Sequence, residues 1–351
     1  MSKNLQYIKL GDSGLSISPI IVGCMSYGDK KWAEWVLDDE EKILGILKKA
    51  YDVGIRTYDT ADVYSNGTSE ILVGKFLKKY NIKRDRVVIL SKVFNVVDES
   101  IPGFNFFARG GEFPEYEFLN SRGLSRKHIL DGVEASVKRL GTYIDVLQIH
   151  RLDRTTPKHE IMKALNDVVL AGHTRYIGAS SMKATEFAQL QFIADKNGWA
   201  KFISMQNYYN LIYREEEREM IPFCNDNIIG KVGLIPWSPL ARGVLARPLK
   251  TESEYNRSSK TDKSFDRLKL EELSEADAEI IKRVEEIAKK RGVSMVIVST
   301  AWVISKGAAP IIGLNSEERV EEIVEAAHFK LTQEEIDYLE QPYVPKQLPV
   351  F

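Results

Sequence analysis

One pattern recurs along the chain and limits the folds that it can adopt. An amphipathic, helix-like stretch ends at a glycine, and a short apolar stretch follows within a few residues, as at Gly54, Gly141, Gly172 and Gly198. Glycine is the usual residue just past a helix, where the backbone turns left-handed. Helices that alternate with short buried strands are typical of a parallel sheet covered by helices.

Polar residues mark the starts of several predicted helices. Ser125 precedes one amphipathic stretch, and Thr156 followed by Pro157 precedes the next. A hydroxyl at the cap and a proline at the first helical position both favour helix initiation. Thr332 and Glu335 have the spacing of a capping box near the end of the chain.

Eight short apolar stretches alternate with these helices and predict a (β/α)₈ TIM barrel. The predicted strands are 20–23, 57–59, 87–91, 144–149, 176–179, 203–206, 234–237 and 310–313. Barrels of this kind often reach 351 residues as one domain, so we expect a single barrel domain over 1–351. Before the first strand, a Gly-containing turn between two short strands predicts a hairpin that plugs the bottom of the barrel.

Charge and cysteine content exclude several classes of protein. Lys and Arg (49) nearly balance Asp and Glu (50), so no net field favours nucleic acid or an anionic membrane. The two cysteines, Cys24 and Cys224, make neither a disulfide framework nor a metal motif. No signal peptide or membrane span is visible, which favours a cytoplasmic protein. The sequence leaves the oligomeric state open.

Polar residues lie where the predicted strands end. They are Asp59, Lys92, His150, Ser180, Ser181, Gln206, Asn207, Trp237 and Ser238. In a (β/α)₈ barrel the carboxyl ends of all strands meet at one mouth, where active sites are found. We therefore expect these side chains to surround a common site.

Tyr64, five residues after Asp59, is the candidate proton donor at this mouth. A free Tyr has a pKa of about 10, and a neighbouring ammonium, here Lys92, lowers it. Asp59 can hold Lys92 as an ion pair, and His150 can orient a carbonyl or join the proton path. Each residue alone also has an ordinary structural interpretation, as a cap, packing residue, surface charge or hydrogen-bonding partner.

At these residues the sequence resembles the aldo-keto reductase superfamily. The stretches are YDTADVYSNGTSE (58–70), SKV (91–93), LQIHR (147–151), YIGASSM (176–182), SMQNYYNL (204–211), PWSPLARG (236–243) and IIGLNSEERVEE (311–322). They cover nearly the whole chain in the family's order. The stretches RGLSRKHI and RLGTYIDVLQIHRLD resemble fungal aryl-alcohol-dehydrogenase-like reductases.

The resemblance implies a metal-free catalytic tetrad and a bound NADPH. The tetrad is Asp59, Tyr64, Lys92 and His150. Ser180, Ser181 and Gln206 match residues that bind the carboxamide, and Trp237 matches the ring that stacks on nicotinamide. The pyrophosphate would meet Ser238, Leu240 and Gly243, and the adenosine end would meet Ile312, Gly313, Asn315, Arg319 and Glu322.

The residues themselves agree with this binding mode, with two departures. A Trp face can stack on a ring, and Arg319 suits a 2′-phosphate. The chain has Gly313 where some relatives place a Lys facing that phosphate, which weakens the preference for NADPH over NADH, and Ile323 where an Asn is usual. No GxGxxG follows an early strand, so a Rossmann mode has no support.

The leading hypothesis is an NADPH-dependent reductase of aldehydes, aromatic or apolar, and of ketones. Alternatives on the same fold are a cofactor-sensing regulatory subunit of the channel β-subunit type and an aldolase with Lys92 as Schiff-base nucleophile. Two long irregular stretches, 95–123 and 245–270, interrupt the pattern. The first is rich in aromatic residues, and it either shapes the substrate pocket or packs on itself at the surface.

Overall fold

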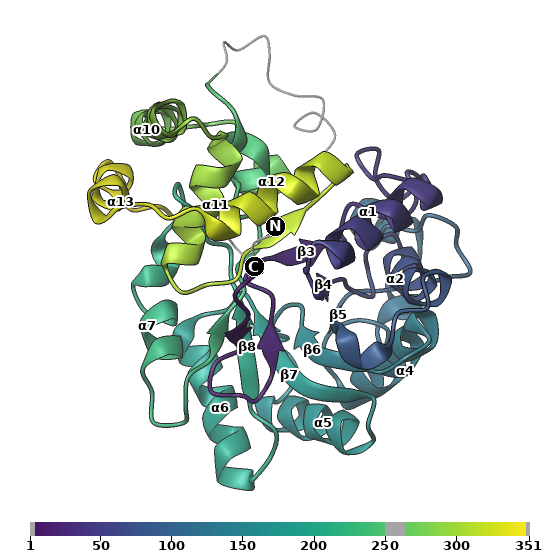
Figure 1. Cartoon of the computed structure of the whole chain (residues 1–351). Helices are drawn as coiled ribbons and strands as arrows, with labels where there is room; N and C mark the ends of the chain where they lie inside the picture. Colours follow the sequence, from purple (N-terminus) through teal and green to yellow (C-terminus); the bar gives the residue numbers. More distant parts are fainter. Residues whose placement is uncertain (1–3, 250–263, 349–351) are drawn as a thin grey trace.

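The computed structural model describes residues 4–249 and 264–348, in which eight parallel strands are surrounded by helices (Figure 1). The strands are β3 (Ile21–Gly23), β4 (Thr57–Asp59), β5 (Val88–Val93), β6 (Ile144–Ile149), β7 (Thr174–Ser180), β8 (Phe202–Gln206), β9 (Gly233–Leu234) and β10 (Ile311–Gly313). Their order is β10-β3-β4-β5-β6-β7-β8-β9, and all neighbours are parallel. All eight predicted strands are confirmed, with small shifts of their ends.

The sheet closes between β9 and β10. The Ala309 amide donates to the Leu234 carbonyl and the Ile311 amide to the Pro236 carbonyl, each at 2.9 Å, and Trp237 and Ile311 form a parallel bridge. Closure satisfies the backbone groups that an open sheet would leave at its edges. The (β/α)₈ barrel predicted from the sequence is therefore the observed fold.

Helices form the outer layer of the barrel, and most of them are amphipathic, whereas α11 is apolar and buried (Figure 1). They are α1 (Glu40–Asp52), α2 (Thr68–Lys79), α4 (Arg126–Leu140), α5 (Lys158–Leu170), α6 (Ala184–Asn197), α7 (Met220–Asn225), α11 (Met295–Ser305) and α12 (Glu317–His328). The chain adds α10 (Glu275–Arg291) and α13 (Gln333–Glu340) outside this layer. None of the helices in the described ranges is long and apolar enough to span a bilayer.

The N-terminal hairpin closes one end of the barrel. Strands β1 (Ile8–Lys9) and β2 (Ser16–Ile17) pair antiparallel, and Leu10 and Ile17 are buried against residues inside the barrel. A Cβ on Gly11 would lie 2.3 Å from the Lys231 carbonyl oxygen, so this turn requires glycine. The predicted plug is confirmed, which leaves the opposite mouth for a site.

The aromatic stretch 95–123 packs largely on itself. Short helices α3 (Phe106–Arg109), η2 (Gly110–Glu112) and η3 (Glu115–Phe118) follow one another there. Phe104 and Phe118 are buried together with Val96, and further aromatic rings surround them. The bulk of the stretch is thus a small separate core, and its two ends lie beside β5, where the Gly123 amide donates to the Phe94 carbonyl at 2.7 Å.

The second long stretch, 245–270, is described only at its ends. Helix η5 (Ala241–Ala246) leads into it and α9 (Ser264–Arg267) leads out of it. Residues 250–263 lie outside the described residues.

Candidate active site

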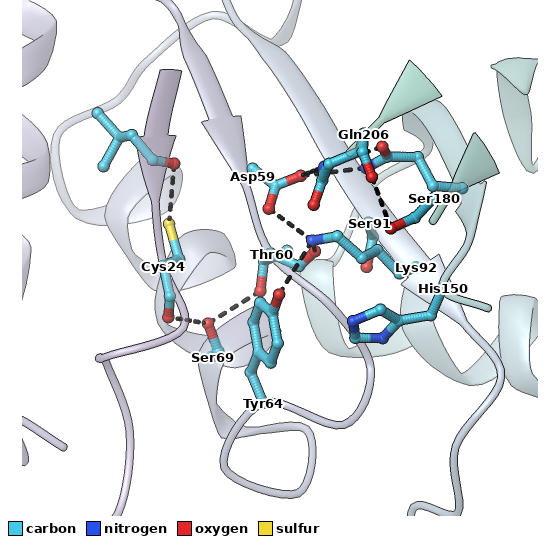
Figure 2. A network of polar contacts seen from close by, with 12 residues as sticks. Cys24, Asp59, Thr60, Tyr64, Ser69, Ser91, Lys92, His150, Ser180 and Gln206 are labelled. Carbon is cyan, nitrogen blue, oxygen red and sulfur yellow. Dashed lines mark hydrogen bonds and ion pairs between the residues drawn. The ribbon is translucent and has the colours of Figure 1, made fainter. Parts of the chain in front are cut away.

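Lys92 lies at the centre of a buried polar cluster at the carboxyl ends of the strands (Figure 2). Its Nζ donates to Asp59 Oδ1 at 2.5 Å, to the Thr60 carbonyl at 2.8 Å and to the Tyr64 hydroxyl at 3.2 Å. The side chain of Lys92 is fully buried, and that of Asp59 is 3% exposed. An ammonium so deeply buried needs an opposite charge and full hydrogen bonding, and both are present here.

The barrel places these groups by strand register. Asp59 is the last residue of β4, Lys92 is next to last in β5, and His150 follows β6 directly. The Asp62 amide donates to the Lys92 carbonyl, which draws the loop that carries Tyr64 over β5. Three of the predicted residues therefore converge because parallel strands end at one face, and Tyr64 joins them from the following loop.

The Tyr64 loop is held by its neighbours. Ser65 and Asn66 have positive φ angles of 48° and 53°, which few non-glycine residues adopt. Asn66 stabilises this backbone conformation by donating hydrogen bonds to the Asp98 and Ile101 carbonyls and by accepting one from the Asp98 amide. These contacts fix the position from which the Tyr64 hydroxyl points at Lys92.

The pKa of Tyr64 is raised above its ordinary value. Burial is the largest cause, Lys92 lowers the pKa, and Asp59 raises it again. The direction differs from the sequence-based prediction, which considered the ammonium but not the desolvation of the phenol. The pKa of Lys92 is also raised, because the Asp59 and Tyr64 partners outweigh burial. The cluster therefore holds a protonated phenol beside a charged ammonium.

His150 completes the site as a neutral ring. Burial lowers its pKa well below the ordinary value, and the charges of Arg151, Lys92 and Arg267 add to the effect. The ring meets Tyr64 edge-on, with centroids 5.8 Å apart. Asn95 Nδ2 lies 3.4 Å from His150 Nδ1. An amide donor at Nδ1 favours the tautomer with the proton on Nε2, where it can be donated to a substrate oxygen.

Asp59 has two further partners, one of which the sequence reasoning missed. Gln206 Nε2 donates to Asp59 Oδ2 at 2.9 Å, and Gln148 Nε2 donates to the same oxygen at 3.0 Å. Gln206 Nε2 also lies 2.9 Å from Gln148 Oε1. Gln148 is a fully buried amide inside β6, two residues before His150. The signal in the sequence for the role of Gln148 was a polar amide within a largely apolar strand.

A second buried network of hydrogen bonds and ion pairs lies next to the Tyr64 loop. Glu70 accepts from the Ser91 hydroxyl and from Arg139 Nε, and Arg139 Nη1 reaches Glu99 at 2.8 Å. The side chains of Glu70 and Arg139 are 0% and 5% exposed. This ion pair joins α2, which starts directly after the Tyr64 loop, to α4 and to the 95–123 stretch.

The predicted nicotinamide residues come together on the other side of the mouth. Trp237 Nε1 donates to Ser181 Oγ at 3.1 Å, and Ser180 Oγ donates to the Gln206 carbonyl at 2.9 Å. Tyr208 stacks on Trp237 with ring centroids 4.7 Å apart and planes at 29°. Tyr208 thus covers one face of the indole, and the guanidinium carbon of Arg151 lies 5.8 Å from the indole centroid.

The segment after Trp237 forms a tight, left-handed loop. Ser238, Ala241 and Arg242 have positive φ angles, and Gly243 has a φ of 96°. The Ala241 amide donates to the Ser238 carbonyl and the Gly243 amide to the Leu240 carbonyl, both at 2.9 Å. The structure thus places the three predicted pyrophosphate residues, Ser238, Leu240 and Gly243, in one compact turn.

The predicted adenosine residues are divided between two places. Ile312 and Gly313 lie in β10, and Asn315 follows just before the Ser316 cap of α12. Arg319 and Glu322 instead line a cavity of about 380 Å³, together with Gly292, Val293, Ser294, Ile297, Glu318 and Glu325. Arg247, also missed in the sequence, has a pKa that is lowered by burial and by the nearby charge of Arg319. Arg247 therefore brings a second guanidinium group near that of Arg319.

The described residues contain no group of three or more His, Cys, Asp or Glu side chains arranged to hold a metal ion. Cys24 and Cys224 are both buried free thiols.

A closed (β/α)₈ barrel whose mouth presents a Tyr, Lys, Asp and His cluster defines a class of oxidoreductases that act on carbonyls and alcohols. Residues 19–343 match the model of the aldo/keto reductase family, and this chain belongs to that family. It is 57% identical over 343 residues to the protein named "Putative aryl-alcohol dehydrogenase AAD16" of Saccharomyces cerevisiae, covering 98% of both chains. It is also 57% identical over 345 residues to versiconal hemiacetal acetate reductase of Aspergillus parasiticus, again covering 98% of both. The predicted resemblance to fungal aryl-alcohol-dehydrogenase-like reductases is confirmed.

Proposed function

We propose that the protein is an NADPH-dependent reductase that converts aldehydes, aromatic or apolar ones above all, and also ketones into alcohols. The observation that carries this proposal is the position of Lys92 Nζ between Asp59 and the Tyr64 hydroxyl. Family membership supports an oxidoreductase with a nicotinamide cofactor. The buried, free thiols agree with a cytoplasmic setting, and we treat the whole barrel as one functional domain.

In this proposal Tyr64 donates the proton and Lys92 assists it. The raised pKa keeps the phenol protonated at neutral pH, which is the state an acid needs. As the substrate oxygen takes the proton, the phenolate that forms is stabilised by the ammonium 3.2 Å away. Neutral His150 donates a hydrogen bond to the same oxygen and orients it. When bound, NADPH supplies the hydride to the carbonyl carbon.

The residues present fit a nicotinamide dinucleotide. Trp237 is an indole held at the barrel mouth by Ser181 and Tyr208, and it offers an aromatic surface for a nicotinamide ring. Of the eight non-glycine residues with positive φ in the described part of the chain, four (Ser181, Ser238, Ala241 and Arg242) belong to the proposed cofactor segments. Such strain is concentrated at ligand sites in proteins.

The opposite end of the proposed site also suits the cofactor. Ser26 Oγ is buried without a hydrogen-bond partner among the described residues, and it lies 3.9 Å from where a Cβ on Gly313 would stand. An orphaned hydroxyl beside a residue without a side chain provides a place for a ligand acceptor. Ile312, Gly313, Asn315 and Glu322 would border the adenosine.

Two arginines support NADPH rather than NADH. Arg319 is exposed on α12, and Arg247 lies close enough for the two charges to affect each other. Paired guanidinium groups are well suited to a phosphate dianion. Some relatives have a Lys at the position of Gly313 that faces the 2′-phosphate. This chain lacks that Lys, and we propose that Arg247, near Arg319, supplies the second positive charge instead.

Spectrophotometric assays of a panel of benzaldehydes, aliphatic aldehydes and ketones, run separately with NADPH and NADH, test the proposal. Oxidation of NADPH with aromatic aldehydes supports it, with the Tyr64→Phe variant as control. Binding of NADPH without turnover of any carbonyl would instead support a regulatory subunit. The aldolase hypothesis is disfavoured, because an ammonium with a raised pKa and two oxygen partners is a poor nucleophile.

A further inference from the structure

We propose that Arg139 is a positioning residue for the reaction, because it holds the Tyr64 loop (residues 60–67) in the place from which the Tyr64 hydroxyl reaches Lys92. This inference rests on the proposed function, since it requires Tyr64 to be the proton donor. Arg139 is the next-to-last residue of α4, in the outer layer of the barrel (Figure 1). Its described hydrogen bonds go to residues outside the tetrad, so it acts on Tyr64 through the loop.

The Arg139 side chain packs against the last residue of the Tyr64 loop. A Cβ on Gly67 would lie 2.7 Å from Arg139 Cδ, so the aliphatic part of the arginine lies directly against the loop backbone. Gly67 has a φ of 91° and is the cap residue at the start of α2. The turn from the loop into the helix therefore combines a left-handed backbone with a close contact to the arginine, and glycine suits both.

The guanidinium of Arg139 holds the first turn of α2. Its Nε donates to Glu70 Oε2 at 2.7 Å, and the other carboxylate oxygen of Glu70 accepts from the Ser91 hydroxyl. Ser91 directly precedes Lys92 in β5 (Figure 2). Charge-assisted hydrogen bonds of this kind are among the stronger ones in proteins. One buried carboxylate thus ties the helix that follows the loop to the strand that carries the ammonium.

The same guanidinium also reaches the segment that holds the middle of the loop. Its Nη1 donates to Glu99 Oε1 at 2.8 Å. The amide of the preceding residue, Asp98, donates to Asn66 Oδ1 at 2.9 Å, and the Asp98 carbonyl accepts from Asn66 Nδ2 at 2.6 Å. Asn66 comes two residues after Tyr64. Contacts that hold the middle of the loop and contacts that hold its end therefore meet at Arg139.

The network is a permanent clamp, because its buried charges are balanced. Glu70 and Arg139 form an ion pair with side chains that are both buried. Burial and the neighbouring charge of Glu70 raise the pKa of Asp62 well above its ordinary value, although Arg139 lowers it, so this loop carboxyl group holds its proton. Removal of Arg139 alone would leave the Glu70 charge in the interior without its cation, which strongly destabilises a protein. A test must therefore remove both charges of the pair together.

A small displacement of the loop is enough to affect the reaction. The Tyr64 hydroxyl lies 3.2 Å from Lys92 Nζ, at the upper end of the usual hydrogen-bond range. A proton donor must lie within about 2.6 to 3.2 Å of the oxygen that it protonates, and a misplacement of about 1 Å can lower a rate about 10²-fold. Ser65 and Asn66 have left-handed backbone conformations that the surrounding contacts must maintain.

The test is single-turnover oxidation of bound NADPH by benzaldehyde, in H₂O and in D₂O, with the whole chain. The double variant Glu70→Gln/Arg139→Met removes both charges of the pair. Arg139→Lys keeps the charge, and Glu99→Ala removes only the outer contact of the guanidinium. Arg126→Met is the matched control, because Arg126 is on the same helix and pairs with Asp167 at the surface.

We expect the rate constant to fall about 10- to 100-fold in the double variant, with a larger solvent isotope effect, because proton transfer from a misplaced Tyr64 is slower. Arg139→Lys should stay within about threefold of the wild type, and Glu99→Ala should lower the rate constant about threefold, as expected for loss of a partly exposed ion pair. Arg126→Met should keep the wild-type rate constant and isotope effect. The Kd for NADPH should be nearly the same in all of these proteins.

A purely structural role would lower the amplitude of the turnover, which measures the amount of folded enzyme, and leave the rate constant and isotope effect unchanged. That result would overturn the inference, as would an equal loss of rate in Arg126→Met. A wild-type rate constant in Glu99→Ala would also overturn it, and this variant decides the question if the double variant does not fold. A wild type that binds NADPH but oxidises none of it with any aldehyde would refute the proposed function instead, which separates the two conclusions.

Discussion

Gln148 Nε2 and Asp59 Oδ2 lie 3.0 Å apart inside the barrel. Gln148 is in β6 and Asp59 is in β4, and β5 lies between these two strands. The same carboxylate oxygen accepts from Gln206, and the other carboxylate oxygen accepts from Lys92. With three donors around it, the Asp59 side chain is held in one orientation. Gln148 therefore positions the residue that positions Lys92, and it also accepts a hydrogen bond at 2.9 Å from Gln206, one of the proposed carboxamide-binding residues.

Gln148→Leu should lower kcat for carbonyl reduction by about tenfold, because Asp59 loses a donor and Lys92 is less firmly oriented. Gln148→Glu should lower kcat further than Gln148→Leu does, since it places a second carboxyl group beside Asp59 and two like charges there repel each other. Steady-state kinetics would show the decrease in kcat as the larger effect, with a smaller rise in the KM for NADPH because Gln206 loses an acceptor. Wild-type kcat in both variants would refute the positioning role.

Tyr64→Phe should abolish most of the reduction while leaving the Kd for NADPH nearly unchanged. The substitution removes only the hydroxyl that contacts Lys92, and general acid catalysis typically contributes about 10² to 10⁴ in rate. Single-turnover oxidation of bound NADPH by an aldehyde, together with a fluorescence titration of NADPH, measures the two effects separately. Retention of most of the turnover would exclude Tyr64 as the acid.

The pH dependence should differ between the two directions of the reaction. Because the pKa of Tyr64 is raised, the acid stays protonated and the rate of reduction should be flat from about pH 6 to 9. Alcohol oxidation needs the phenolate as base and should rise with pH over the same range. Lys92→Met removes the group that lowers this pKa, so the rise should move to higher pH. A rise that does not move would mean that Lys92 does not tune Tyr64.

The sequence predicted the fold well because the barrel is built from local, repeated signals. Strands β4, β6, β7 and β8 are short apolar runs that follow helices ending near a glycine, and caps such as Ser125 and the Thr332–Glu335 box are found as predicted. The Thr156–Pro157 start was wrong by one position. Pro157 is the cap residue of α5, and the Thr156 hydroxyl instead donates to Asp153. The Thr156 hydroxyl therefore binds the Asp153 carboxylate in the preceding loop instead of capping the helix.

The sequence predicted which of these side chains come together at the strand ends, but not their electrostatics. Strand-end positions brought Asp59, Lys92 and His150 together, since register alone determines that they share a face. The direction of the Tyr64 pKa could not be predicted, because desolvation depends on packing from segments distant in sequence. Partners such as Gln148 and Arg139 were missed for the same reason: their role appears only when the strands and helices are assembled.

Arg319→Ala should weaken the binding of NADPH more than that of NADH. The guanidinium is proposed to meet the 2′-phosphate, which NADH lacks. Arg247→Ala should act in the same direction, since the two charges lie close together. Calorimetric Kd values for both cofactors in each variant provide the measurement. Equal losses for NADPH and NADH would show that these arginines do not contact the phosphate.

Glu216→Gln should stabilise the fold at neutral and alkaline pH. Burial raises the pKa of Glu216 to about 7, even though Asn207 donates to its carboxylate at 2.6 Å. The folded state thus binds a proton that the unfolded state releases near pH 4.5, and stability falls as the pH rises between these values. Gln keeps an acceptor for Asn207 without the charge, so the gain above pH 7 should be about 1 to 3 kcal/mol.

Urea unfolding of the wild type and Glu216→Gln at pH 5 and pH 8 measures this difference. The variant should show a smaller decrease in stability between the two pH values, because it lacks the group that must lose a proton in a buried site. Glu219→Gln is the matched control, since Glu219 is an exposed residue in the same segment, and it should follow the wild type. A Glu216→Gln variant that loses as much stability as the wild type would mean that Glu216 titrates alike in the folded and unfolded states.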